Sequence, residues 1–95
     1  MIFGIVAGSV VSDTKSESLP AAKYLLVQSC DRAGALKDDY LVAIDQLGAG
    51  MGEMVLVSQG SSARQTEYTD KKPIDAVIVG IVDLIDEHGK TAYKK

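Results

Sequence analysis

Short apolar runs, rich in β-branched residues, recur along the chain and are separated by polar segments that contain Gly, Ser, Asp or Pro. Runs of this length with such boundaries are typical of β-strands, and none has the length and 3.6-residue period of a convincing helix. Several short strands with turn signals between them favour a closed or sandwiched all-β domain. The strands are predicted at Ile2–Val11, Lys23–Gln28, Tyr40–Leu47, Glu53–Ser58 and Ala76–Leu84.

The segments between the predicted strands carry further local signals. Ser29–Asp39 is expected to be a hairpin connection with Gly34 at its tip, because glycine tolerates a positive φ. In the longest connection, Ser61 or Ser62 is expected to N-cap one or two helical turns. The residues Asp86–Lys95 are charged and are interpreted as a tail that is frayed or used at a contact.

The composition narrows the class of protein. The chain has 95 residues, the size of one domain with a thin hydrophobic core that would benefit from a partner surface. Its 10 basic and 13 acidic residues give a net charge of −3, which weighs against nucleic-acid and anionic-membrane partners. A single cysteine, Cys30, allows no intrachain disulfide and favours a reducing cytoplasm, so it is interpreted as a small apolar side chain. Neither a signal peptide nor a membrane helix is predicted at the apolar start of the chain.

The most distinctive local motif is the glycine-rich stretch Gly48–Glu53, between the third and fourth predicted strands. A dinucleotide-binding loop needs G-x-G-x-x-G before a helix, whereas a strand follows here. A P-loop needs Lys and Ser or Thr after its last glycine, and Glu53 would place a negative charge where the phosphate should bind. The motif is therefore interpreted as a tight turn, with Gly50 at a positive φ and the backbone close to another element or another subunit.

The other polar residues form no convincing catalytic or metal-binding set. His88 is the single histidine and lies in the charged tail, and no serine has an evident general base. Asp83 and Asp86 are interpreted as solvated carboxylates or interface ion pairs. Arg64 is either a surface charge or a residue that binds carbonyls or a carboxylate. The sequence predicts no enzyme, no metal and no cofactor.

Nucleic-acid binding is one alternative, because small β-barrels bind single strands through a basic groove lined with aromatic rings. The four tyrosines and one phenylalanine do not alternate with Lys or Arg on one strand, which weighs against that mode. A small enzyme or ligand-binding module is a second alternative. From the residues alone, the chain is a small soluble all-β domain that is expected to be oligomeric.

Long blocks of this sequence resemble the vertex proteins of bacterial microcompartments, of the ethanolamine-utilisation and carboxysome type. The blocks are GIVAGSVVSDTK and KYLLVQ near the start, VAIDQLGAGMGEMVLVSQGSSAR in the centre, and PIDAVIVGIVD towards the end. The central block is long and specific. The resemblance covers about residues 1–84, which it identifies as the domain of that family, and leaves 85–95 as a charged C-terminal tail.

This resemblance implies a small five-stranded barrel, similar to the oligonucleotide-binding fold, with a short helical turn and assembly as a ring of five; a ring of six is an alternative. It implies a structural shell protein in the bacterial cytoplasm that closes the corners of an icosahedral shell. Hexameric facet proteins are then the expected partners, whereas catalysis, nucleic acid, membranes and cofactors are not expected. The residues expected at the subunit interface or near the fivefold axis are Gly48, Ala49, Gly50, Met51, Gly52, Glu53, Ser61, Ser62 and Arg64.

Overall fold

The computed structural model describes residues 1–11, 23–60 and 76–95, and in these ranges the chain is all-β, without an α-helix. None of the described segments is therefore a helix that could span a membrane. The helical turn predicted after Ser61 or Ser62 lies outside the described residues. The strands are β1 (Ile2–Val10), β2 (Lys23–Cys30), β3 (Leu36–Asp45), β4 (Met54–Gln59), β5 (Ala76–Ile81), β6 (Leu84–Glu87) and β7 (Lys90–Lys94).

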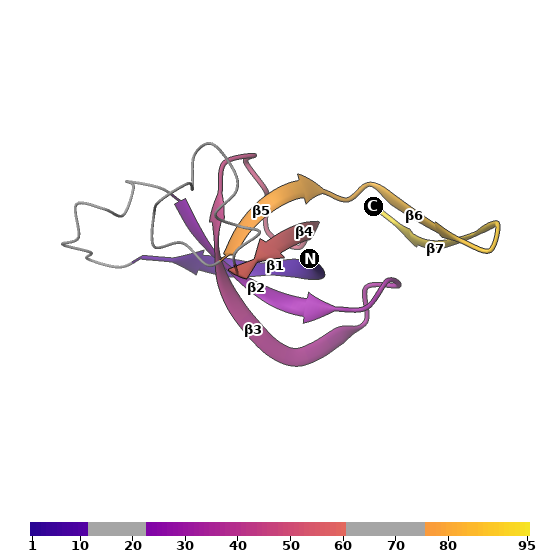
Figure 1. The fold of residues 1–95 in the computed structure, drawn as a ribbon, viewed down its shortest axis with the longest axis horizontal. Coiled ribbons are helices and arrows are strands. Elements are labelled where there is room, and N and C mark those ends of the chain that lie inside the picture. Colours follow the sequence, from indigo (N-terminus) through magenta and orange to yellow (C-terminus); the bar gives the residue numbers. More distant parts are fainter. Residues whose placement is uncertain (12–22, 61–75) are drawn as a thin grey trace.

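Strands β1 to β5 close into a barrel in the order β1-β2-β3-β5-β4 (Figure 1). The strand pattern predicted an all-β domain that was either closed or sandwiched, and the closed form is the one present, as the family resemblance implied. Neighbouring strands are antiparallel except β3 and β5, which run parallel. Within the described residues this parallel pair consists of one bridge, Ile44↔Val77, whereas β2 and β3 pair over most of their length. The barrel is therefore closed at β3 and β5 by a short seam.

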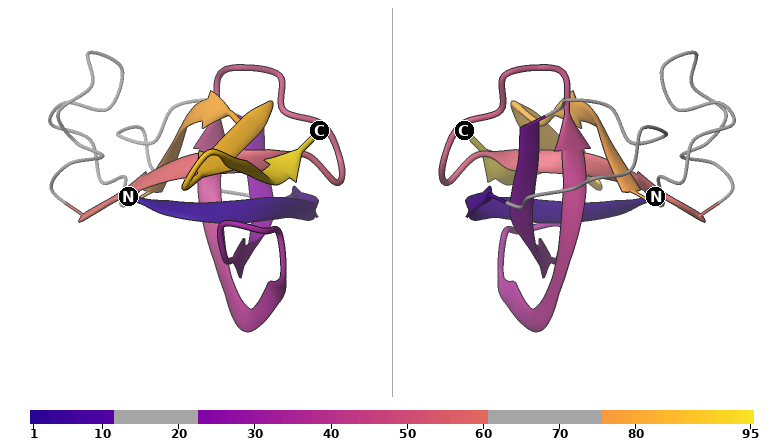
Figure 2. Two further views of the ribbon diagram at one scale, coloured as in Figure 1. Left: turned by 90° about the vertical axis from the view of Figure 1, so that its right-hand side faces the viewer. Right: turned by 90° about the vertical axis from the view of Figure 1, so that its left-hand side faces the viewer.

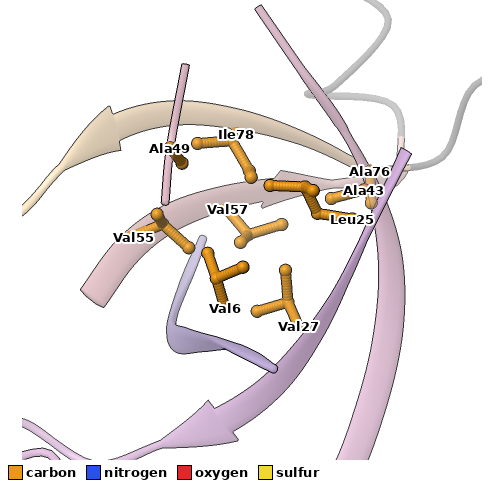
Figure 3. Packing of buried hydrophobic residues seen from close by; sticks show 9 residues of the cluster. All are labelled: Val6, Leu25, Val27, Ala43, Ala49, Val55, Val57, Ala76 and Ile78. Carbon is orange, nitrogen blue, oxygen red and sulfur yellow. The ribbon is translucent and has the colours of Figure 1, made fainter. Parts of the chain in front are cut away.

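Side chains alternate between the two faces of each strand, and those on the inner face fill the barrel interior. The interior cluster draws on every barrel strand and on the loop after β3, as Figure 3 shows. At Gly4, an added Cβ would overlap the Cγ1 of Val27, so the absence of a side chain lets β1 pack closely on β2. The buried members of the cluster are Val6, Leu25, Val27, Ala43, Ala49, Val55, Val57, Ala76 and Ile78.

The hairpin between β2 and β3 is confirmed, and its strands are longer than the sequence pattern predicted. Gly34 has a φ of 88°, and the Asp31 carboxylate accepts the N–H groups of Ala33 and Ala35, both at 2.9 Å. β3 begins at Leu36 rather than at Tyr40. The residues added at the start of β3 are all exposed, so they lack the apolar alternation of a half-buried strand. In Figure 2 this part of β2 and β3 projects past β1 as a two-stranded ribbon.

The residues interpreted as a charged tail form instead the β-hairpin β6–β7, which is a sheet separate from the barrel (Figure 1). The predicted strand Ala76–Leu84 ends at Ile81, and Val82 and Asp83 lie between it and β6. The hairpin is held by a second apolar cluster outside the barrel interior. This cluster consists of Cys30, Met54 and Val82, with Phe3, Ile5, Leu56, Ile85 and Tyr93 packed against them.

Candidate functional site

The glycine-rich loop, residues 46–53, joins β3 to β4 and is the tight turn that the sequence predicted. Its positive-φ residues are Gly48, at 78°, and Gly52, at 82°. The prediction that Gly50 holds a positive φ is wrong, because Gly50 is not among the described left-handed residues. Instead, Gly50 sits beside the Glu53 side chain, where an added Cβ would lie 3.2 Å from Oε1.

Asp45, the last residue of β3, fixes the first half of the loop. Its side chain is fully buried, with a relative exposure of 0%, and lies 3.8 Å from the Nζ of Lys23. Its two carboxylate oxygens accept the backbone N–H groups of Leu47 and Ala49, each at 3.0 Å. Because the methyl group of Ala49 is buried in the barrel interior, Asp45 holds this part of the loop against the core.

Glu53, the residue before β4, fixes the second half. Its Oε1 accepts the N–H of Gly50, its own N–H donates to the Gly50 carbonyl at 3.1 Å, and its Oε2 pairs with the Nζ of Lys95. The Lys95 ammonium, and after it the Gly50 amide, hold the pKa of the Glu53 carboxyl below its ordinary value. The same hydrogen bond raises the pKa of Lys95. Lys95 is itself placed by its N–H, which donates to the Asp83 carbonyl at 2.9 Å.

The close backbone approach expected of this loop is made to β1 of the same chain. The N–H of Gly52 donates to the Val6 carbonyl at 2.9 Å, and the N–H of Val6 donates to the Glu53 carbonyl at 3.0 Å. These two bonds extend the pairing of β1 beyond β4 and into the loop. The loop is therefore a rigid part of the barrel wall.

This geometry leaves little for a phosphate to bind. The amides of Leu47, Ala49, Gly50 and Gly52 already donate to protein acceptors, and the acceptor at Gly50 is the negatively charged Glu53 carboxylate. The loop instead presents apolar surface, since the Met51 side chain is 70% exposed. A rigid loop with an exposed apolar tip is suited to contact with another protein surface.

The structure brings together the predicted site residues Gly48, Ala49, Gly50, Met51, Gly52 and Glu53 in one loop. The other predicted residues, Ser61, Ser62 and Arg64, lie outside the described residues. Sequence reasoning missed Asp45 and Lys95. A buried carboxylate that caps the amides two and four residues later is a recognised turn signal, so Asp45 could have been found. Nothing in the sequence indicated that Lys95 would reach Glu53.

Among the residues that the structure describes, no three His, Cys, Asp or Glu side chains gather as a metal-binding group. His88 lies in the turn of the β6–β7 hairpin. Cys30 is buried in the cluster beneath that hairpin, and burial raises the pKa of its thiol. Such a thiol behaves as a small apolar side chain, as the sequence analysis predicted.

Comparison with known proteins gives a consistent result over the whole chain. The family model described as "Ethanolamine utilisation protein EutN/carboxysome" matches residues 1–83. The carboxysome shell vertex protein CcmL of Gloeobacter violaceus is 44% identical over 95 residues, covering 100% of this chain and 95% of that protein. The microcompartment shell vertex protein GrpN of Rhodospirillum rubrum is 45% identical over 86 residues, covering 90% of this chain and 97% of GrpN.

Solved structures agree with these relatives. The structure of Gloeobacter violaceus CcmL superposes with a TM-score of 0.93, at 44% identity, and covers 100% of this chain and 98% of that one. The structure of GrpN, described as a pentameric microcompartment shell protein, superposes with a TM-score of 0.81 and covers 92% of this chain and 99% of that one. The division at residue 84 into a family domain and a tail stays a prediction. The chain belongs to the EutN/CcmL family, whose named members are shell vertex proteins of carboxysomes and other bacterial microcompartments.

Proposed function

We propose that this chain is a structural shell protein, which assembles as a ring of five and caps the corners of an icosahedral bacterial microcompartment. The observation that carries the proposal is a match over the whole chain, at 44% identity and with a TM-score of 0.93, to a protein named as a carboxysome shell vertex protein. The pentameric description of the related GrpN structure supports the number of copies.

The role follows from geometry. A layer of hexagonal units is flat, and replacing one hexagonal unit by a pentagonal one removes a sector and forces curvature. A ring of five copies needs a heterologous contact, in which one patch of each copy meets a different patch of the next. Hexameric facet proteins around the ring are the partners that such a cap requires, and the shell would lie in the bacterial cytoplasm.

In this role the protein acts through its shape and needs no cofactor or catalytic group. The glycine-rich loop supports that interpretation, because most of its amides bind the protein's own carboxylates and carbonyls. Its contribution is a wall segment of fixed conformation. A fixed wall is useful in an assembly, because ordering a mobile loop on association would cost free energy.

Light scattering of the purified protein tests the ring directly. We expect a native mass of about five times the chain mass of 10.1 kDa. A hexamer would retain the family and the fold but remove the argument from curvature. A monomer at micromolar concentration would refute the proposed ring.

Mixing the protein with a purified hexameric facet protein tests the capping role. Facet protein alone should assemble into sheets or tubes, and addition of the ring should give closed polyhedral particles visible by electron microscopy. The protein used in this experiment should form rings and carry no hexahistidine tag. The control is an unrelated pentamer of similar charge. If closed particles form equally well without this protein, it is not the cap.

A further inference from the structure

We propose that the β6–β7 hairpin is a movable strap, residues 84–95, which opens as one unit from the junction of Val82 and Asp83. Opening uncovers the buried side chains of Cys30 and Met54 while the barrel stays closed. This conformational device goes beyond the proposed function, because it belongs to each copy and does not depend on the number of copies in the ring. Figure 1 shows the hairpin beside the barrel and extending past it.

The strap has no strand partner in the barrel. Each barrel strand pairs with two other barrel strands, whereas β6 and β7 pair only with each other in the part of the chain that the structure describes. A two-stranded hairpin is at best marginally stable in water by itself. The strap therefore depends on the side chains that hold it against the barrel, and its release breaks no strand pairing of the barrel.

The root of the strap is fixed, which locates the point of opening. Val82 is buried in the cluster outside the barrel interior, and its N–H donates to the Met54 carbonyl at 2.8 Å. The next residue, Asp83, has an exposed side chain and directly precedes β6. Neither residue belongs to a strand. Rotation about the backbone at this junction can therefore lift the strap and leave β5 in place.

Few apolar side chains of the strap hold it down. Ile85 and Tyr93 pack against the cluster, and because they are cross-strand partners they lie on one face of the hairpin. Tyr93 also lies against the β2–β3 turn, where an added Cβ at Gly34 would be 3.3 Å from its ring. Both side chains are only partly buried, whereas Cys30 and Met54 are 4% and 0% exposed. A segment with few buried contacts of its own is typical of local opening.

An ion pair holds each end of the strap to a loop of the barrel. At the turn of the hairpin, Glu87 pairs with Arg32 of the β2–β3 turn, and at the other end Lys95 pairs with Glu53. The side chains of Arg32 and Lys95 are 58% and 49% exposed, so solvent screens both pairs and each stabilises the closed strap only slightly. The pairs fix where the strap lies and leave it able to open.

Opening would expose the part of the outer barrel surface that the strap covers. Phe3 and Ile5 on β1 and Leu56 on β4 surround Met54 there. The thiol of Cys30 lies in the same cluster, and burial raises its pKa, so little reactive thiolate is present while the strap is closed. Because Cys30 is the single cysteine of the sequence, its reactivity reports the opening directly.

Alkylation of Cys30 by iodoacetamide across a urea series tests the proposal on the wild-type protein. Below the unfolding transition we expect a labelling rate lower than that of the urea-unfolded chain, yet nearly independent of urea, because local opening exposes little surface. Within the transition the rate should rise steeply. A rate that follows global unfolding at every urea concentration would refute the strap, as would a native thiol that reacts as fast as the unfolded one.

Matched variants test which contacts hold the strap. We expect Arg32→Gln to raise the native labelling rate about two- to fivefold, the range for a partly exposed ion pair, and Tyr93→Ala to raise it at least about tenfold through lost packing. Lys94→Gln, which removes an exposed charge from β7, is the control and should label like wild type. Each rate is divided by that of the same variant unfolded in urea, which corrects for intrinsic thiol reactivity.

The direction of the Arg32→Gln effect separates opening from electrostatics. Loss of a positive charge two residues from Cys30 disfavours the thiolate and would by itself slow labelling. A faster rate therefore reports a looser strap. If Arg32→Gln and Tyr93→Ala both label like wild type, or if Lys94→Gln labels equally fast, the inference is wrong.

Hydrogen exchange followed by mass spectrometry tests the strap without a variant or a label. Amides of residues 84–95 should exchange together and sooner than those of β2 and β4, which stay in the barrel. Exchange of β4 at the same rate as the strap would show that opening is not confined to the hairpin. Should Tyr93→Ala fail to fold, Arg32→Gln and the exchange experiment decide. Light scattering measures the ring separately, so failure of the strap leaves the proposed function standing.

Discussion

The carboxylate of Asp45 accepts a hydrogen bond from the backbone N–H of Ala49 at 3.0 Å, and the methyl group of Ala49 lies in the barrel interior. One buried acid thus couples the end of β3 to the core through a residue four positions later. It is an internal cap, comparable to the N-cap of a helix, that satisfies two amides which would otherwise be left without acceptors.

Replacing Asp45 by Asn should lower the free energy of unfolding by about 1.5–3 kcal/mol, the range for losing a buried hydrogen bond to a charged group. The side-chain amide of Asn keeps one acceptor oxygen, but its NH2 group replaces the other. That group would face the N–H of Leu47 or Ala49, so that two donors meet and neither has an acceptor. Urea unfolding at a fixed protein concentration measures the effect. Asp38→Asn, on the exposed part of β3, is the matched control and should unfold like wild type. Equal midpoints for both variants would contradict the role of Asp45.

Gly52→Ala and Gly50→Ala should differ in stability. Gly52 has a φ of 82°, a conformation that costs an L-residue about 1–2 kcal/mol. At Gly50 the added methyl group would meet only the end of the flexible Glu53 side chain, which can move by a few tenths of an ångström. Thermal unfolding should therefore show a clearly lower midpoint for Gly52→Ala than for Gly50→Ala. The reverse order would mean that the Glu53 contact constrains the loop more than its left-handed residues do.

The ion pair between Glu53 and Lys95 should stabilise the fold only within a window of pH. Because the pKa of Glu53 is lower in the folded state, its stabilisation is present above the ordinary pKa of glutamate and is lost as the pH falls through the lowered value. Because the pKa of Lys95 is raised, its stabilisation is present below the ordinary pKa of lysine and is lost as the pH rises through the raised value.

The difference in stability between wild type and Lys95→Met, measured by denaturant unfolding across pH, should therefore be largest near neutral pH and vanish at both extremes. Lys94→Met is the control for loss of one positive charge from the same hairpin. Both partners of the pair are partly exposed, so added salt should reduce the difference. A difference that is constant with pH would show that Lys95 acts through packing rather than through charge.

His88→Asn should stabilise the β6–β7 hairpin. Glu87 pairs with Lys90, which leaves His88 and Gly89 as a two-residue turn with φ values of 53° and 76°. This is the type I′ geometry in which Asn-Gly is preferred. We expect a gain of about 0.5–1 kcal/mol in unfolding free energy. His88→Ala serves as the comparison and should show no gain, because alanine lacks the tolerance of asparagine for this conformation.

The barrel strands could be predicted because each has one face in a closed interior, so that apolar residues alternate or run together. The exposed start of β3 could not, since residues such as Lys37 and Asp38 have no buried face there. The same holds for β6 and β7, in which Ile85 and Tyr93 are the apolar residues packed against the barrel. Two apolar contacts in a charged segment are too few to distinguish a hairpin from a tail.

The candidate site was located by its glycines, but its internal geometry was not predictable from them. The spacing of Gly48, Gly50 and Gly52 indicated a turn, and it did not indicate which of them is left-handed. That choice depends on which amides the side chains of Asp45 and Glu53 bind, and so on contacts that form only when the loop lies against β1. Long-range partners such as Lys95 depend on the fold of the hairpin.

The barrel closes between β3 and β5 through the single described bridge, Ile44↔Val77, and this has a consequence for biosynthesis. A chain that emerges from the ribosome from its N-terminus presents β1 to β4 before β5 exists, with edges of β3 and β4 open. Open edges of a partly made barrel are the features that promote wrong association between nascent chains. The period of greatest risk therefore ends only when residues 76–81 leave the ribosome, and productive assembly with other copies has to follow that moment.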